Sequence, residues 1–366
     1  RRVEALFQQV SDSSVQRPGW DLARLASYAL AICVHVAFLA LIGLAIWLIV
    51  AISSIVTIVL GLFALLLAFE LRPRLGSFGK LKNVRHRGDA PVLFGVLDQV
   101  AAETGARPAH AVVIDADWNA AYTTVGWRRR RVVILGLPLW DVLPADQKIA
   151  VLGHEFAHGV NGDARRGIVV GTSIATLNRL YVLLQPGPRL HRANPQTALA
   201  EAFMPVILAA LRSVVVSMLI MHRLVSLRAS QRAEYLADAI AARVASPAST
   251  AGALDTIVTG RSTHSWVLQR RKFSVGKIAF WDQMRSDLSA IPQSEKERRR
   301  REHARDRLRV TDTHPPTHLR IKMVQGLPVS KAVISLSATQ EAAIRAELAQ
   351  DYDRISTQID GASRLR

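Results

Sequence analysis

The chain has 366 residues, of which 50% are hydrophobic, and it carries a formal net charge of +18 at pH 7. This length allows a sizeable core, and the mean hydropathy of +0.17 exceeds that of most soluble domains, which indicates that part of the chain lies in lipid. The only cysteine, Cys33, excludes an intrachain disulfide and fits a reducing compartment.

The first predicted element is a membrane hairpin. No residue between Arg24 and Glu70 carries a formal charge. As one helix this run would extend about 67 Å, roughly twice the ~30 Å hydrocarbon core of a bilayer. We therefore expect two transmembrane helices over residues 25–71, with a turn near Ser53 and Ser54. A cleaved signal peptide fits less well, because its apolar region would be far shorter.

Basic residues flank this hairpin on both sides, whereas its turn carries no charge. Arginines precede it in residues 1–24, and lysines and arginines follow it over residues 72–87. The positive-inside rule then places both flanks in the cytoplasm. We expect residues 1–24 to be a cytoplasmic segment of a multi-pass protein of the inner or plasma membrane.

A polar region of mixed composition begins near Gly79. Three short β-prone runs, 111–114, 120–125 and 132–135, are separated by turn-like or charged residues and predict a small sheet. This sheet should belong to the first part of a cytoplasmic domain over residues 79–165.

A predicted helix after the sheet carries the most informative motif. Pro144 marks its start, and a mostly apolar pattern continues through His154 and His158. Four residues advance a helix by about 400°, so both imidazoles leave the same face and can bind one Zn²⁺. Glu155 lies between them and can take a proton from metal-activated water. This is the HExxH signature of a zinc hydrolase.

The third zinc ligand is predicted downstream. Glu234 and Asp238 are again four residues apart on a probable helix, so one carboxylate can bind the metal while the other accepts a hydrogen bond from a ligand histidine. Glu234 is the better candidate for the ligand and Asp238 for the supporting role. Alternatively, Glu234 is an ordinary helix carboxylate paired with Arg228 or Arg232.

The region between the two motifs, residues 166–228, contains two further apolar stretches. The first, 168–184, includes Arg179, and the second, 202–222, includes Arg212. Because a charge at the bilayer centre is costly, these stretches are predicted either to span the membrane or to lie partly in its interface.

Together these residues resemble the HtpX-type integral-membrane zinc metalloproteases, which are related to the CAAX prenyl endopeptidases. The resemblance extends from about residue 26 to 326 and includes the position of the hairpin. It rests on three motifs, which are His154 to His158 followed by Asn161-Gly162-Asp163, Glu234 to Asp238, and Thr313-His314-Pro315 followed by Arg320-Ile321.

The resemblance implies a mainly helical α+β fold, in which a gluzincin-type metalloprotease domain with a small sheet follows the transmembrane hairpin. It implies one Zn²⁺ per chain, bound by His154, His158 and Glu234. It also makes Glu155 the general base.

Two other residues receive roles through the same resemblance, and two more through the chemistry of the reaction. Asn119 and Ala120 resemble residues at the start of a strand beside the active-site cleft, where an extended substrate could pair with the strand edge. His314 and Arg320 are candidates for stabilising the oxyanion. The alternatives are a surface histidine in a rigid loop for His314 and a structural ion pair for Arg320.

The positive charge is concentrated in residues 128–131 and 296–309. For a chain held at a membrane, contact with anionic lipid headgroups is the preferred explanation. Nucleic-acid binding is not expected, since no RNA-binding or zinc-knuckle pattern is present. A solvated helix is an alternative for the second run, because acidic residues are interspersed in it.

The sequence thus predicts a membrane-anchored zinc endopeptidase that cleaves membrane or misfolded proteins in quality control and stress response. Its catalytic domain would combine residues 79–165 and 229–350, face the cytosol and end in a tail over 351–366. The alternatives are a zinc-binding scaffold without turnover and a CAAX-type prenyl-protein endopeptidase, and the latter would need an enclosed chamber within the membrane.

Overall fold

A computed structural model describes residues 22–52, 54–160, 167–185, 198–271, 279–305 and 315–362. The chain divides into two units. The helical unit contains Gly19–Leu75 and Arg165–Ala229, and the sheet unit contains Gly76–Ala164 and Ser230–Arg366.

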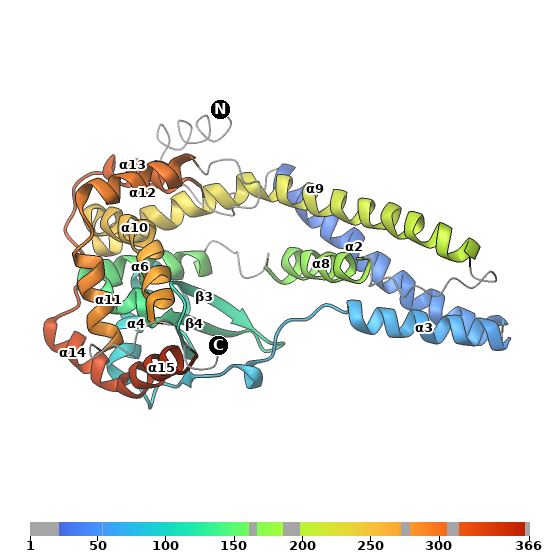
Figure 1. The fold of residues 1–366 in the computed structure, drawn as a ribbon, viewed down its shortest axis with the longest axis horizontal. Helices are drawn as coiled ribbons and strands as arrows, with labels where there is room; N and C mark the ends of the chain where they lie inside the picture. Colours follow the sequence, from blue (N-terminus) through green and yellow to red (C-terminus); the bar gives the residue numbers. More distant parts are fainter. Residues whose placement is uncertain are drawn as a thin grey trace. The chain divides into compact units, whose positions relative to one another are not determined.

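The helical unit consists of apolar helices (Figure 1). In chain order these are α2 (Leu22–Trp47) with its π-helical continuation η1 (Leu48–Ile52), α3 (Ile55–Leu71), η3 (Gly167–Gly171), α8 (Thr172–Leu183) and the first part of α9 (Ala198–Ala245). Ser54, at the predicted turn, begins α3 with a capping box, in which its hydroxyl accepts a hydrogen bond from the Thr57 amide at 3.2 Å. Helix α2 packs against both α3 and α8.

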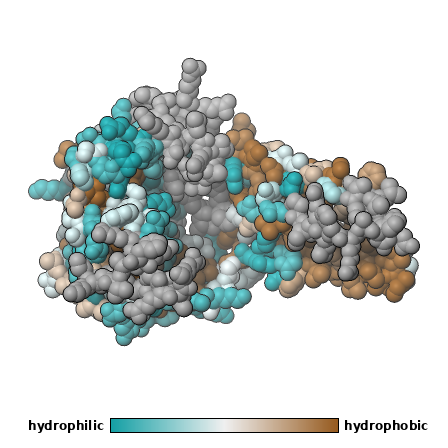
Figure 2. Space-filling model, viewed as in Figure 1, coloured by the Kyte–Doolittle hydropathy of each residue, from teal (hydrophilic) through white to brown (hydrophobic). Residues whose placement is uncertain are grey.

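Hydrophobic side chains cover the outer surface of these helices (Figure 2). Two stretches, Arg24–Ala51 and Phe203–Ala245, are long and apolar enough to cross a membrane, and only 17% and 11% of their most apolar windows are buried. A core helix of a soluble protein would be mostly buried, so both stretches are candidate membrane spans. Helix α3 and Ile168–Leu183 are apolar but shorter.

Arg179 is a charged residue of α8, within a predicted apolar stretch, and its side chain reaches the C-terminal end of α3. Its guanidinium donates hydrogen bonds to the backbone oxygens of Leu71, at 3.3 Å, and Arg72, at 2.7 Å. The Thr176 hydroxyl donates to the Leu71 oxygen as well, at 3.1 Å. These contacts satisfy carbonyl groups that the end of a helix leaves without partners, and they explain how the apolar helix α8 tolerates a charge.

The sheet unit is built around a mixed four-stranded sheet. Its strands are β1 (Val84–Arg85), β2 (Ala111–Asp115), β3 (Ala120–Val125) and β4 (Arg130–Gly136), in the order β1-β2-β4-β3. Strands β2 and β4 are parallel, whereas β1 and β3 pair antiparallel with their neighbours. The three predicted β-prone runs fall within β2, β3 and β4, and β3 lies at an edge of the sheet.

Helices pack beside this sheet, and the β3–β4 hairpin extends beyond them (Figure 1). They are α4 (Pro91–Thr104), α5 (Leu137–Val142), α6 (Ala145–Val160), the last part of α9, α10 (Pro247–Arg271), α11 (Phe280–Ser289), α12 (Gln293–Arg305), α13 (Thr317–Gln325), α14 (Ala338–Glu347) and α15 (Ala349–Ala362), and a 3₁₀ turn η2 (Phe78–Lys80) precedes β1. The predicted fold class, α+β and mainly helical with a small sheet, is therefore confirmed.

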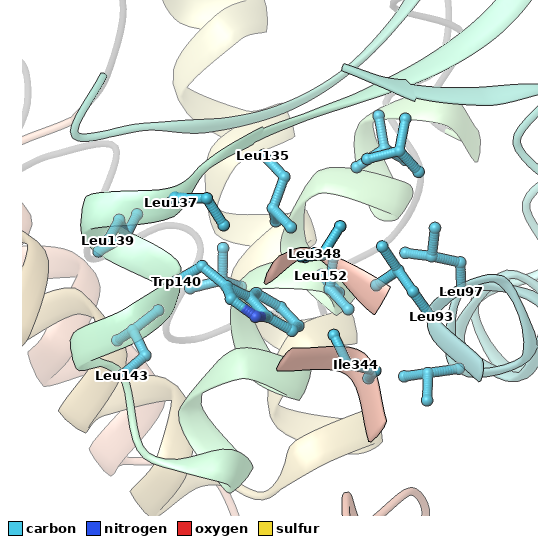
Figure 3. Close-up of a cluster of buried hydrophobic side chains, with 14 of the residues drawn as sticks. Leu93, Leu97, Leu135, Leu137, Leu139, Trp140, Leu143, Leu152, Ile344 and Leu348 are labelled. Atoms are coloured by element: carbon cyan, nitrogen blue, oxygen red, sulfur yellow. The ribbon is translucent and has the colours of Figure 1, made fainter. Parts of the chain in front are cut away.

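The core holds α6 in place. Figure 3 shows Leu93 of α4, Leu135 of β4 and Leu152 of α6 together with Ile344 and Leu348 near the end of the chain, and all five are at most 1% exposed. Burying each such side chain contributes about 1.5–3 kcal/mol. The helix that carries both histidines thus packs against elements from both segments of the sheet unit.

Gly136 gives a first test of this packing. A Cβ at this position would lie 1.9 Å from the Asp117 carbonyl oxygen and 2.6 Å from that of Asn119, both of which are backbone atoms. We expect Gly136→Ala to destabilise the sheet unit by about 1–3 kcal/mol or more, which thermal unfolding of the purified chain in detergent would measure. Gly95→Ala on α4 is the matched control, because its new Cβ would meet nothing within 4 Å. Equal unfolding temperatures for the two variants would contradict this packing.

Candidate metal centre

Helix α6 presents its two histidines on the side away from the core. It begins at Ala145, directly after the predicted start at Pro144. Leu152 and Phe156 are fully buried. His154 and His158, each about half a turn away from them, have side chains that are 12% and 20% exposed. The apolar pattern of the sequence therefore fixes which side of the helix remains available to a ligand.

The side chains of three potential metal ligands meet at this side of α6. The Nε2 atoms of His154 and His158 are 3.1 Å apart. The Glu234 carboxylate, on the last part of α9, approaches them with Oε2 3.6 Å from His154 Nε2 and Oε1 3.5 Å from His158 Nε2. These three residues form a potential metal-binding group.

The spacing of these donors fits zinc. With bonds of about 2.0–2.1 Å and tetrahedral angles, neighbouring ligand atoms around Zn²⁺ are about 3.3 Å apart. The two histidine nitrogens are slightly closer than this value, and each of them is slightly farther than this value from one of the two Glu234 oxygens. Two imidazoles and one carboxylate are also a donor set that zinc enzymes use, and they leave one coordination position open.

A buried ion pair lies behind the donors. Asp238 Oδ1 is 2.9 Å from His154 Nδ1. Arg320 of α13 donates to both Asp238 oxygens, through Nε at 2.7 Å and through Nη2 at 2.6 Å. Its Nη1 is also 3.3 Å from Glu234 Oε2. With Asp238 accepting from Nδ1–H, the Nε2 lone pair of His154 is directed at the metal position.

The charges of this pair stabilise one another. Burial by itself would raise the pKa of Asp238, but Arg320 and the contact with His154 hold it below its usual value. Burial also opposes the charge of Arg320, yet the carboxylates of Asp238 and Glu234 raise its pKa above the usual value. Both groups are therefore ionised at neutral pH, although Asp238 is fully buried and Arg320 is 7% exposed.

The remaining predicted residues differ in what the structure shows of them. Glu155 follows His154 on α6, is partly exposed, and contributes to the raised pKa of Arg320. It is therefore next to a donor residue in the chain and is not buried. The contacts of Arg320 with Asp238 and Glu234 match the ion-pair alternative rather than a free oxyanion donor. His314 lies outside the described residues, as do Asn161, Gly162 and Asp163.

Strand β3 lies beside α6. The ring of Tyr122 packs on that of Phe156, with centroids 4.8 Å apart. Ala120 begins the strand, and the exposed Asn119 precedes it and accepts a hydrogen bond from the Gly136 amide at 2.9 Å. Tyr122 was not among the predicted site residues. The two-residue period of a strand, which places it on the same face as Ala120, was the signal that could have identified it.

A family model, Peptidase family M48, matches residues 91–327. Comparison with curated proteins and with solved structures found no significant match. The matched region covers more than half of the chain and contains both α6 and the segment with Glu234 and Asp238. This agrees with the resemblance that the sequence motifs indicated. The chain therefore belongs to peptidase family M48 and is a metalloprotease.

Proposed function

We propose that this metalloprotease is a membrane-anchored zinc endopeptidase that hydrolyses peptide bonds of membrane or misfolded proteins in membrane-protein quality control. The observation that carries this proposal is the convergence of His154, His158 and Glu234 at 3.1–3.6 Å, with Glu155 beside them. The apolar, exposed helices of the helical unit support the anchoring. We place the sheet unit in the cytosol because basic residues flank residues 25–71.

The side chains divide the chemistry between them. His154, His158 and Glu234 would hold one Zn²⁺, which when bound supplies a Lewis acid that activates water and the substrate carbonyl. Glu155 would accept a proton from the attacking water and return it to the leaving amine. Because Glu155 is partly exposed, both water and substrate can reach it.

The edge of β3 is the proposed binding strand for the substrate. Strand β3 pairs with β4 on one side, and all six of its residues are partly exposed. A peptide could add to the other side, beside Asn119 and Ala120, through backbone hydrogen bonds. Recognition of this kind depends little on side chains, so it suits a protease with broad specificity.

Arg320 and Asp238 are proposed to position the ligands rather than to touch the substrate. We expect Asp238→Asn to weaken zinc binding by about 10–100-fold, because the amide holds His154 and Arg320 less firmly. Zinc affinity, measured by competition with a chelating dye, would detect this change. Saturating zinc should restore much of the proteolytic activity, which a simple loss of folding would not allow.

Asp255→Asn is the matched control for this prediction. Asp255 of α10 forms a similar two-bond pair with Arg300, at 2.6 and 2.8 Å, but contacts none of the three donors. The zinc affinity of the Asp255→Asn variant should equal that of the wild type. If the two variants weakened zinc binding equally, the positioning role of Asp238 would be wrong.

Two other functions can be tested against this proposal. The purified chain, loaded with zinc, would be incubated with casein, with a panel of membrane proteins and with a farnesylated CAAX peptide. Cleavage of casein and of membrane proteins at several sites is the expected result. Cleavage of the prenylated peptide alone would indicate the narrower endopeptidase, and a zinc-loaded chain that cleaves nothing would indicate a scaffold.

A further inference from the structure

The hairpin between β3 and β4 ends in an exposed aromatic residue. Val125 pairs with Arg130, so residues 126–129 form the tip of the hairpin. Gly126 and Arg129 have φ angles of 74° and 51°, in the left-handed region that tight turns use. The side chain of Trp127 is 88% exposed. An indole held in solvent by a tight turn has an apolar surface that the described fold does not bury.

The arginines at this tip differ in their contacts. Arg131 donates to the Pro108 carbonyl oxygen at 2.7 Å, and the guanidinium of Arg130 lies 4.5 Å from the centre of the Phe78 ring. The Arg129 amide donates to the Gly126 carbonyl oxygen at 3.0 Å, but within the described residues the guanidinium groups of Arg128 and Arg129 form neither a hydrogen bond nor an ion pair. Two positive charges therefore follow Trp127 in the turn, and no described acidic side chain forms an ion pair with them.

The second basic run, on α12, is different. Arg298 forms ion pairs with Glu295 and Glu302, Arg299 with Glu295, and Arg300 with Asp255. Arg299 also donates to the hydroxyl of Thr263 on α10 at 2.6 Å. Three of the four consecutive arginines are thus engaged within the protein. Among the described residues of this run, Arg298, Arg299 and Arg300 have acidic partners, whereas Arg128 and Arg129 at the hairpin tip have no ion pair.

The hairpin also packs against a segment that a short stretch of chain connects to the apolar helix α3. A Cβ on Gly76 would lie 3.3 Å from Cγ1 of Val125, so the end of β3 next to the tip packs against the segment that begins at Gly76. Gly76 follows Leu71, the last residue of α3, by five positions. Five extended residues span at most about 18 Å. This limit comes from chain length alone and holds however the two units are placed.

We propose that residues 126–129 form a membrane-docking tip that binds the surface of an anionic bilayer. Trp127 enters the interfacial region, where indole rings are preferred, and Arg128 and Arg129 contact lipid phosphates. This inference rests on the proposed membrane anchoring. Because β3 runs into the tip, docking also holds the proposed substrate strand near the bilayer surface, where unfolded segments of membrane proteins emerge.

A fluorescent probe at the tip tests this proposal. The full chain, with Cys33→Ser and Trp127→Cys, would be labelled with the dye NBD and reconstituted into vesicles of phosphatidylcholine, with or without phosphatidylglycerol. In the anionic vesicles we expect a blue-shifted emission and quenching by lipids that carry a headgroup nitroxide. Arg128→Gln with Arg129→Gln should reduce both signals. A probe at Val329, which is fully exposed in the same unit, is the control and should remain in water.

Proteolysis provides a second measurement. A triple variant would combine Trp127→Ala, Arg128→Gln and Arg129→Gln. In anionic vesicles this variant should cleave a membrane-anchored substrate several-fold more slowly than the wild type does. It should cleave soluble casein at the wild-type rate. Failure of the proposed function would appear differently, as no casein cleavage by either protein. A probe at position 127 that stays in water in both kinds of vesicle would overturn the docking tip. A blue shift caused by casein or nucleic acid without lipid would overturn it too.

Discussion

Glu155→Gln is expected to abolish proteolysis while zinc remains bound. Glutamine has nearly the same shape as glutamate, but its amide cannot accept a proton from water, and a positioned general base contributes about 10²–10⁴-fold to the rate. Glu155 is not one of the three donors, so the metal content should stay at that of the wild type. Initial rates with casein and zinc content by mass spectrometry, measured on the same samples, give both quantities.

Glu103→Gln is the matched control for this substitution. Glu103 of α4 pairs with Arg243, away from the three donors. The same chemical change there should leave the proteolytic rate unaltered. Should Glu155→Gln retain most of the activity, Glu155 would not be the general base. Should it instead lose both zinc and activity, its contribution would be structural.

Glu234→Ala is expected to have the second large effect, namely the loss of zinc. The change leaves His154 and His158 as ligands, and two imidazoles from one helix bind zinc more weakly than the full set. A ligand that binds the native state raises stability by RT ln(1 + [L]/Kd). Zinc should therefore raise the unfolding temperature of the wild type but not that of the variant. Thermal unfolding in detergent over a range of zinc concentrations measures this difference.

Glu341→Gln separates loss of a ligand from loss of stability. Glu341 pairs with Lys148, on the same helix as the two histidines, but is not one of the donors. Leaving the buried Lys148 without its partner should lower stability without changing the response to zinc. If zinc stabilised Glu234→Ala as strongly as it stabilises the wild type, Glu234 would not be a ligand.

Much of this centre could be predicted from the sequence because its pattern is local. The spacing of His154 and His158 places two imidazoles on one helix face whatever surrounds the helix. The same holds for Glu234 and Asp238. The runs that became β2, β3 and β4 were also identifiable, because short β-prone segments stand out between polar turns.

The contacts of Arg320 could not be predicted in the same way. The sequence suggested either an oxyanion donor or a structural ion pair. The choice depends on how α13 packs near the last part of α9, which brings Arg320 to both oxygens of Asp238. Such a long-range contact leaves no local signal in the residues on either side.

The two basic runs show a similar limit. Both were expected to contact lipid headgroups, since net charge alone does not show which arginines already have partners. On α12, Glu295 and Asp255 neutralise neighbouring arginines. Trp127 was overlooked in the sequence, although Gly126, between two β-prone runs, indicates a turn tip. Its exposure follows from the pairing register of β3 and β4.

The most direct test of the account is a zinc titration of activity. Zinc would be removed from the wild-type chain with a chelator, and the rate of casein cleavage would then be measured as zinc is returned in increments. We expect the rate to rise from zero and to stop increasing at one equivalent of zinc per chain. A chain that binds one zinc and cleaves nothing, or one that cleaves casein equally well without metal, would contradict it.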